Sequence, residues 1–233
     1  MNTNTKKILF NELLTTFSEL PAEFEDQIVL YQEYMMMYSC ALKEVVTKFE
    51  ILNDELKVRH QRSPIEFIQS RVKRPKSILE KIQRKGYEPS LEFFDQINDI
   101  AGVRIICSFI DDIYEVVSMF LKQDDITLIQ CKDYIKNPKE NGYRSYHLVV
   151  EVPVFFSDVK TPLKVEVQVR TIAMDFWASL EHQLKYKKGL SHAGELTNRL
   201  KDSADRISVL DVQMQGIRKD IEQHNKIYSQ NEK

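Results

Sequence analysis

The stretch LKVEVQVR, residues 163–170, decides the fold. Its apolar and polar residues alternate strictly, with Leu163, Val165, Val167 and Val169 in one set and Lys164, Glu166, Gln168 and Arg170 in the other. Successive side chains of a β-strand point to opposite faces of the sheet. The pattern therefore predicts a strand with one face on a hydrophobic core and a second face rich in charged and amide groups.

Six other segments have strand or helix patterns. The strand-like segments are AGVRIICSF (101–109), TLIQCKDYI (127–135) and YHLVVEVPVFF (146–156). The helical segments are KSILEKIQRKG (76–86), DDIYEVVSMFLKQ (111–123) and TIAMDFWASLEHQLKYKK (171–188). Strands and helices mixed in this way predict an α+β or α/β sheet domain over residues 61–190.

Long helices are expected on both sides of this domain, in residues 1–60 and 191–233. Residues 22–63 contain no glycine or proline, and apolar residues recur there at alternating steps of four and three. Residues 196–228 repeat this heptad pattern, which indicates a helix with one apolar seam. A shorter helix is expected around residues 5–20. Such long seams exceed what a compact sheet domain can cover, so we expect them to bury against each other, within or between chains.

Charge and cysteine content narrow the class of protein. The chain has 233 residues and a net charge of -2, so its overall charge indicates no particular partner. Residues 59–88 nevertheless hold nine basic and three acidic side chains, which favours a local anionic ligand. The three cysteines form no CxxC pair, so neither a disulfide framework nor a zinc site is expected. No long apolar run lies near either end, so we expect a cytoplasmic protein without a signal peptide or membrane span.

The basic segment has a pattern suited to polyphosphate. Arg71 and Lys73 are two apart on a strand-like lead-in and therefore share a face. Ser77 and Lys81 are four apart, on one face of a helix that would begin near Pro75. Cations that converge near a helix start suit a polyphosphate, although a solvated basic helix face would have the same composition. The chain contains neither G-x-x-x-x-G-K-[ST] nor G-x-G-x-x-G, so a P-loop or Rossmann phosphate site is excluded.

Two carboxylates are candidates for a magnesium site. Glu166 lies on the polar face of the strand at 163–170, and Asp99 lies just before the strand that begins at Ala101. Mg²⁺ is commonly bound by one or two carboxylates, with phosphate oxygens and water as its other ligands. The alternatives are the solvated side of a sheet for Glu166 and a turn or helix end for Asp99.

The loop KDYIKNPKENGYRSYH (132–147) combines cations with aromatic rings. Lys132 and Lys139 are mobile charges suited to phosphate. Tyr143 follows a turn glycine, where its ring can be presented for stacking on a base. His147 begins the next strand and could donate to a phosphate oxygen. The composition indicates a nucleotide site, and RNA binding uses the same residue types.

Four blocks in order resemble the (p)ppGpp synthetase domain of the RelA/SpoT family: RVKRPKSILEK (71–81), DIAGVRI (99–105), the loop at 132–147 and VEVQVRT (165–171). More narrowly, the chain resembles the small, stand-alone alarmone synthetases. The resemblance implies an α+β fold, with a mixed, nucleotidyltransferase-like β-sheet flanked by long N- and C-terminal helices. It also implies transfer of the β,γ-pyrophosphate of ATP to the ribose 3′-hydroxyl of GDP or GTP with release of AMP, in the stringent response.

On the donor side, the resemblance implies ATP contacts and a metal centre. Five residues would hold ATP: Arg71 and Arg104 around the adenine, and Lys73, Ser77 and Lys81 at its phosphates. Asp99 would bind Mg²⁺, and Glu166 would bind metal or take the proton of the 3′-hydroxyl.

On the acceptor side, the resemblance implies six contacts with GDP or GTP: Lys132, Lys139, Tyr143, His147, Gln168 and Asp175. Tyr143 would stack on guanine, while Lys139 and His147 would contact phosphates. Asp175 stands where some relatives have Asn and would accept hydrogen bonds from the guanine edge. Residues 130–133 read Gln-Cys-Lys-Asp, where long, bifunctional members tend to have Arg-x-Lys-Asp.

The resemblance further implies a symmetric homotetramer. None of the five histidines is followed by aspartate, so a synthetase without the HD-type hydrolase domain of long members is expected. Two alternative functions belong to other classes of protein, an RNA-binding module and a nucleotide sensor without activity. An RNA-binding module would have no use for Asp99 or Glu166, and a nucleotide sensor without activity would lack these acids.

Overall fold

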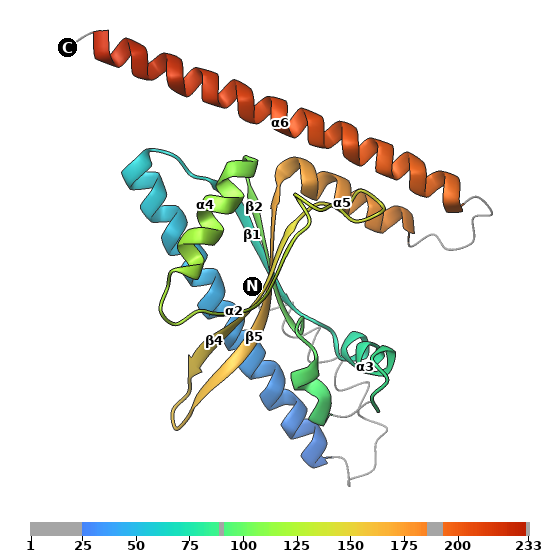
Figure 1. Ribbon diagram of the computed structural model, residues 1–233. Coiled ribbons are helices and arrows are strands. Elements are labelled where there is room, and N and C mark those ends of the chain that lie inside the picture. Colours follow the sequence, from blue (N-terminus) through green and yellow to red (C-terminus); the bar gives the residue numbers. More distant parts are fainter. Residues whose placement is uncertain (1–24, 89–90, 186–192, 232–233) are drawn as a thin grey trace, which may run out of the picture. The chain divides into compact units, whose positions relative to one another are not determined.

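The computed structural model describes residues 25–88, 91–185 and 193–231, which Figure 1 draws as ribbons. The chain divides into two compact units, Met1–Met37 and Tyr38–Lys233. The division falls within helix α2 (Glu25–His60), whose opening turns are the described part of the first unit. The short helix expected around residues 5–20 lies outside the described residues. The predicted domain boundaries near residues 60 and 190 stay predictions.

The second unit contains a mixed sheet of five strands. These are β1 (Ile65–Val72), β2 (Ala101–Cys107), β3 (Thr127–Asp133), β4 (Tyr146–Phe155) and β5 (Lys160–Thr171). Their order is β1-β2-β5-β4-β3, with β2 and β5 parallel and the other neighbours antiparallel. The predicted α+β fold with a mixed sheet is confirmed. The sequence indicated β1 only as a strand-like lead-in at Arg71.

Strand β5 has the alternation predicted for residues 163–170. Its apolar set is buried, and the polar set up to Gln168 is partly exposed. Arg170 differs from the prediction, because it belongs to the polar set yet is only 4% exposed. The alternation thus identifies the core face correctly, while the burial of Arg170 depends on partners from other elements.

The register of the sheet aligns polar residues across all five strands. Gln69 of β1 pairs with Arg104 of β2, and Arg104 pairs with Gln168 of β5. Gln168 pairs in turn with His147 of β4, and His147 pairs with Lys132 of β3. Paired residues of neighbouring strands point to the same face. Four predicted ligands from three separate sequence blocks therefore lie side by side.

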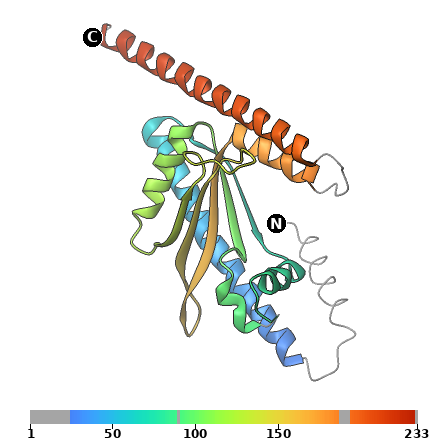
Figure 2. The same cartoon turned by 45° about the vertical axis from the view of Figure 1, so that its right-hand side comes forward.

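The other elements are α3 (Pro75–Arg84), the 3₁₀ helix η2 (Leu91–Gln96), α4 (Ile110–Leu121), α5 (Ile172–Lys185) and α6 (Ala193–Asn231). Helix α6 packs along α5 and also contacts α4, as Figures 1 and 2 show from two angles. Within the described residues, no helix is both long and apolar enough to cross a membrane.

The seam of α2 from Tyr38 onward is buried within the second unit, so the expectation that the two helix seams cover each other was wrong for this helix. The ring of Phe49 stacks on that of Phe120 in α4, with centroids 4.3 Å apart. Lys48 forms an ion pair with Asp125 at 2.6 Å. The expectation treated the sheet domain, residues 61–190, as too small to cover the seam, but α4 of that domain presents an apolar surface to α2.

Candidate functional site

Two cavities meet at three polar residues of the sheet unit. The larger, of about 520 Å³, is lined by β3, β4, β5 and the loop between β3 and β4. The smaller, of about 340 Å³, is lined mainly by β1 and β2. Asp99, Glu166 and Gln168 line both. Cavities of this size suit small-molecule ligands, and their shared wall contains both acids that the sequence predicted to be catalytic.

Most residues predicted to hold ATP lie around the smaller cavity. Arg71, Lys73 and Arg104 line it. Lys81 reaches the shared wall from α3 through its contact with Asp99. Ser77 is half-buried on α3 and lines neither cavity. The structure therefore brings four of the five predicted ATP contacts together and leaves Ser77 apart from the cavity walls.

Asp99 pairs with two lysines and retains one unpaired oxygen. Its Oδ2 accepts hydrogen bonds from Nζ of Lys73 and Nζ of Lys81, each at 2.6 Å. Burial raises the pKa of the Asp99 carboxyl, but the hydrogen bonds and charges of the two lysines outweigh burial and hold that pKa below its ordinary value. Its Oδ1 is buried and has no hydrogen-bond partner among the described residues. At neutral pH, Asp99 is therefore an ionised carboxylate with one oxygen available to a further ligand.

The residues predicted to hold GDP or GTP line the larger cavity, with one exception. Those that line it are Lys132, Lys139, Tyr143, His147 and Gln168. Nζ of Lys139 lies 4.8 Å from the ring centroid of Tyr143 and 4.7 Å from that of Tyr134. The loop thus presents a cation and two aromatic rings to the same cavity, which is the combination that the sequence predicted.

Arg170 holds three of the predicted acceptor residues, although the sequence assigned it no role. Its Nη2 donates to Oη of Tyr143 at 2.6 Å and to Oε1 of Gln168 at 3.0 Å. Its Nη1 donates to Oδ1 of Asp175 at 3.0 Å. The guanidinium also lies 5.1 Å from the ring centroid of Tyr143. These bonds satisfy the buried charge of Arg170, and they orient the tyrosine ring.

The hydrogen bonds of Tyr143 continue through His147 toward Glu166. Oη of Tyr143 lies 2.7 Å from Nε2 of His147. This Oη also accepts from Arg170, and the other ring nitrogen of His147, Nδ1, lies 3.9 Å from Oε1 of Glu166. Burial, together with the charges of Arg170 and two nearby lysines, lowers the pKa of His147 to about 3. The imidazole of His147 is therefore neutral at pH 7, and its two ring nitrogens face Tyr143 and Glu166.

Asp175 is the exception among the predicted acceptor residues, because it does not line the larger cavity. Its Oδ1 accepts from Arg170 and lies 3.4 Å from Nη1 of Arg104, so it connects the two arginines. The acidic residue of α5 that does line the cavity is Glu181, which is 9% exposed. Its Oε1 accepts a hydrogen bond from Nδ2 of Asn141 at 3.0 Å.

Comparison with known proteins identifies the family. A model of the region found in RelA / SpoT proteins matches residues 70–191. GTP pyrophosphokinase YwaC of Bacillus subtilis (strain 168) is 44% identical to this chain over 210 residues, which are 90% of this chain and 98% of that protein. The chain belongs to the RelA/SpoT family. GTP pyrophosphokinase YjbM of the same organism is 37% identical over 203 residues, which cover 87% of this chain and 95% of that protein.

Solved structures of RelA/SpoT-type alarmone synthetases have the same fold. Small alarmone synthetase 1 of Bacillus subtilis, bound to its product pppGpp, matches with a TM-score of 0.75 and 38% identity over 82% of this chain and 98% of that chain. Small alarmone synthetase 2 of the same organism matches with a TM-score of 0.74 and 44% identity over the same shares of the two chains. None of these names supports the RNA-binding alternative.

The two acids of this RelA/SpoT chain fit Mg²⁺. Asp99 is ionised and has a buried oxygen without a partner among the described residues, and Glu166 lines the same two cavities. The described residues contain no cluster of three or more potential metal ligands. Mg²⁺ commonly takes only one or two carboxylates, with phosphate oxygens and water as the remaining ligands, so a nucleotide-dependent metal site suits these residues.

Among the residues that the sequence did not assign to the site, Asn141 and Glu181 line the larger cavity, and Arg170 orients Tyr143 at its wall. Asn141 directly precedes the turn glycine Gly142, so its local sequence indicates a turn and no ligand. Arg170 belongs to the alternating strand, and the pattern assigned it to the polar face without a partner. Glu181 has no local signal, because only the packing of α5 brings it to the loop that contains Asn141.

Proposed function

We propose that this protein is a GTP pyrophosphokinase that transfers the β,γ-pyrophosphate of ATP to the 3′-hydroxyl of GDP or GTP, giving ppGpp or pppGpp and AMP. The observation that carries the proposal is the meeting of two cavities at Asp99, Glu166 and Gln168. The names of the relatives, GTP pyrophosphokinases YwaC and YjbM, support it. ATP occupies the smaller, arginine-lined cavity, and the acceptor nucleotide occupies the larger one.

In the proposed reaction, the acceptor 3′-oxygen attacks the β-phosphorus of ATP. The bond from this phosphorus to the oxygen of the α-phosphate breaks, and AMP leaves. Glu166 takes the proton of the hydroxyl, while Lys73 and Lys81 neutralise phosphate charge. Mg²⁺, bound by Asp99 and Glu166, would supply further charge neutralisation on the phosphates. Phosphoryl transfer depends mainly on alignment of the reactants and stabilisation of charge. The adjoining cavities would align the two nucleotides, and the lysines beside Asp99 would stabilise the phosphate charge.

The direct test is incubation of the purified protein with Mg²⁺, γ-labelled ATP and either GDP or GTP, followed by separation of the nucleotides. We expect the label in a guanosine nucleotide with two additional phosphates, and AMP in equal amount. Omission of the guanosine nucleotide should abolish AMP formation. Label found only in inorganic phosphate would overturn the proposal.

Glu181 is the residue proposed to read the guanine edge, since a carboxylate can accept from both N1–H and the 2-amino group. Glu181→Gln should raise the KM for GDP by about 10-fold, which corresponds to the lower end of the free energies of hydrogen bonds to charged groups. The KM for ATP should stay within about twofold. Inosine diphosphate lacks the 2-amino group, so the wild type should use it less well than GDP. If the wild type and Glu181→Gln prefer GDP over inosine diphosphate to the same degree, this role of Glu181 is contradicted.

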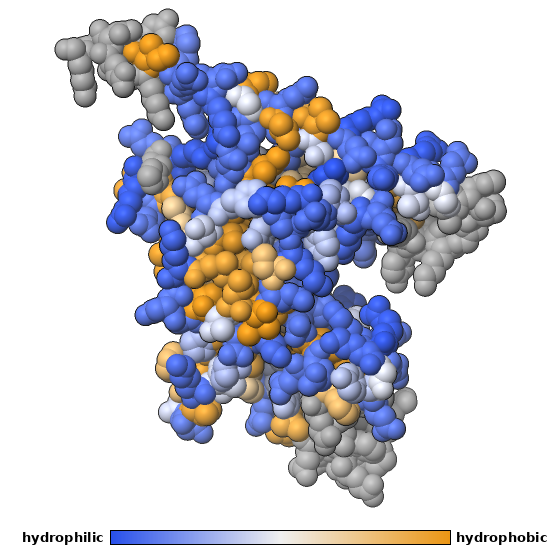
Figure 3. Space-filling view, viewed as in Figure 1, coloured by the Kyte–Doolittle hydropathy of each residue, from blue (hydrophilic) through white to orange (hydrophobic). Residues whose placement is uncertain are grey.

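A homotetramer, the assembly expected from the family resemblance, is also part of the proposal. Four seam residues of α6, namely Leu210, Met214, Ile217 and Ile221, are 49% to 56% exposed. Figure 3 shows apolar side chains on the surface along this helix. Exposed apolar patches commonly mark protein–protein contacts, so the seam of α6 is proposed to be covered by further copies of the chain.

Leu210→Asp should reduce the molar mass measured by light scattering, because the new charge would have to be buried between copies. The melting temperature of the sheet unit should change little. Leu42→Asp is the contrasting variant, since Leu42 is 6% exposed within its own chain; it should lower the free energy of unfolding by several kcal/mol. A wild-type monomer at micromolar concentration would refute the assembly.

A further inference from the structure

We infer that helix α6 supports the acceptor site from outside the cavity, and that its docking on residues 142–144 positions the ring of Tyr143. The inference rests on the proposed function and deepens it, because it assigns a positioning role in acceptor binding to a helix outside the four sequence blocks. The first observation is the close approach of the loop to the helix. Gly142 has φ +88°, and a Cβ on it would lie 2.5 Å from Cβ of Ala204 and 3.3 Å from Cα of Lys201. The contact therefore requires a small residue on each side.

The residue after Tyr143 also binds α6. Nη2 of Arg144 donates to Oδ1 of Asp205 at 2.9 Å. Its Nη1 donates to the carbonyl oxygen of Gly142 at 3.0 Å and to that of Ala204 at 3.4 Å. Arg144 thus joins the backbone of the loop to the backbone of the helix. The residues before and after Tyr143 are both held by the same turn of α6.

The side chain of Tyr143 packs against the same helix. Trp177, Ala178 and Ala204 form a buried cluster, and Tyr143 packs on it together with residues 200 and 207 of α6. Nε1 of Trp177 donates to the carbonyl oxygen of Leu200 at 3.0 Å. The cluster therefore supports the ring from α5 and α6 together.

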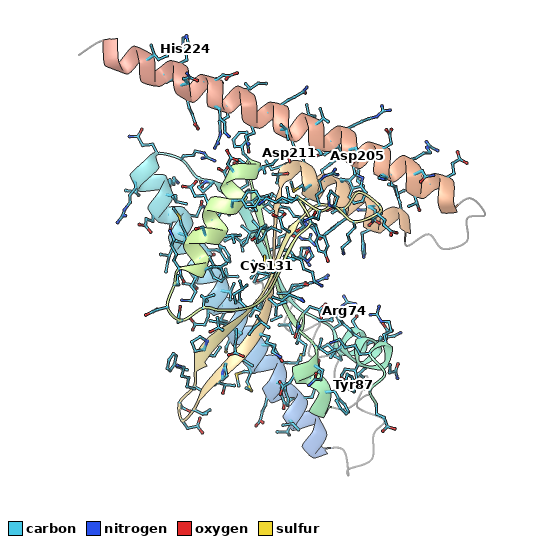
Figure 4. All side chains as sticks on the ribbon, viewed as in Figure 1. Arg74, Tyr87, Cys131, Asp205, Asp211 and His224 are labelled. Atoms are coloured by element: carbon cyan, nitrogen blue, oxygen red, sulfur yellow. The ribbon has the colours of Figure 1, made fainter. Side chains whose placement is uncertain are left out.

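A further hydrogen bond holds α6 where β5 ends. Oγ1 of Thr171 donates to Oδ2 of Asp211 at 2.6 Å. Asp205 and Asp211 both lie on the stretch of α6 beside α5, as Figure 4 shows. The far part of α6, where Figure 4 labels His224, takes no part in these contacts.

The side chain and backbone of Tyr143 are consequently held by different parts of the fold. Arg170 and His147, from the sheet, fix its hydroxyl, and α6 fixes its backbone and supports its side chain. A stacking platform binds a base well only when its position is set in advance. Helix α6 lines neither cavity itself, but it packs against Tyr143, which lines the larger cavity and not the smaller one. Displacing α6 should therefore weaken acceptor binding and leave ATP binding unaffected.

The test uses the full chain and Ala204→Leu, with Ser203→Leu as control. Ser203 is the exposed neighbour of Ala204 on α6, and its hydroxyl bonds only within the helix, to the carbonyl of Arg199. Calorimetry should give a Kd for GDP at least about fivefold higher in Ala204→Leu, the lower limit of the stacking contribution. The KM for ATP should stay within about twofold, and Ser203→Leu should match the wild type. Emission of Trp177, the single tryptophan, reports displacement of the helix.

A milder pair of variants keeps the inference testable if Ala204→Leu does not fold. Asp205→Ala removes the partner of Arg144, and Asp202→Ala removes an acid that pairs only along the helix, with Arg206. Asp205→Ala should raise the Kd for GDP by about two- to fivefold, the range for an exposed ion pair, and Asp202→Ala should not. Unchanged GDP binding in Ala204→Leu and Asp205→Ala would overturn the inference. A wild type that binds GDP but forms no product would overturn the proposed function alone.

Discussion

Glu166→Gln is expected to lower turnover by at least about 10²-fold, the range for loss of an acid–base or key electrostatic group. Glu166 lines both cavities, and Nδ1 of His147 lies 3.9 Å from its Oε1. Glutamine preserves the shape of the side chain but neither takes a proton nor carries charge for a metal. The measurement is the initial rate of AMP formation at saturating ATP and GDP.

The matched control for Glu166→Gln is Glu151→Gln. Glu151 lies on β4, pairs in register with Lys164 of β5, and lines neither cavity. The Glu151→Gln variant should retain the turnover and the melting temperature of the wild type. Asp99→Asn should also lose at least about 10²-fold in turnover, but it leaves Lys73 and Lys81 without a charged partner, so its melting temperature will fall as well. Near-normal synthesis by Glu166→Gln would end the assignment of Glu166 as the catalytic carboxylate.

Tyr143→Ala is expected to raise the KM for the acceptor by roughly 5- to 150-fold, since stacking a base on an aromatic ring is worth about 1–3 kcal/mol. The KM for ATP should hardly change, because Tyr143 lines the larger cavity and not the smaller one. The check is a pair of initial-rate series in which each nucleotide is varied in turn.

Tyr143→Phe separates the ring from its hydroxyl. Phenylalanine keeps the stacking surface but loses the bonds to Arg170 and His147. We therefore expect Tyr143→Phe to bind the acceptor better than Tyr143→Ala and less well than the wild type. A Tyr143→Ala variant that lost affinity for ATP instead would show that the ring belongs to the donor site.

Much of the fold could be predicted from periodicity. The strict alternation at 163–170 predicted which face of β5 is buried, because side chains of a strand alternate regardless of what they pack against. The heptad steps predicted α2 and α6 for the same local reason. Periodicity identifies an apolar face but not its partner, so the expectation that the two helix seams cover each other was wrong for α2.

The amino-acid sequence by itself determined the sheet and the chemical class of the site. It supplied lysines and arginines for phosphates, two acids for Mg²⁺, and a tyrosine that can stack on a base. These groups lie in four blocks, so their types and spacing are visible locally. Only the tertiary structure decided which of them meet. The register of five strands aligned Arg104, Gln168 and His147, and the packing of α5 and α6 brought Glu181 and Ala204 to the loop of Tyr143. Contacts between residues far apart in sequence depend on how whole elements pack, and no local pattern of residues encodes that packing.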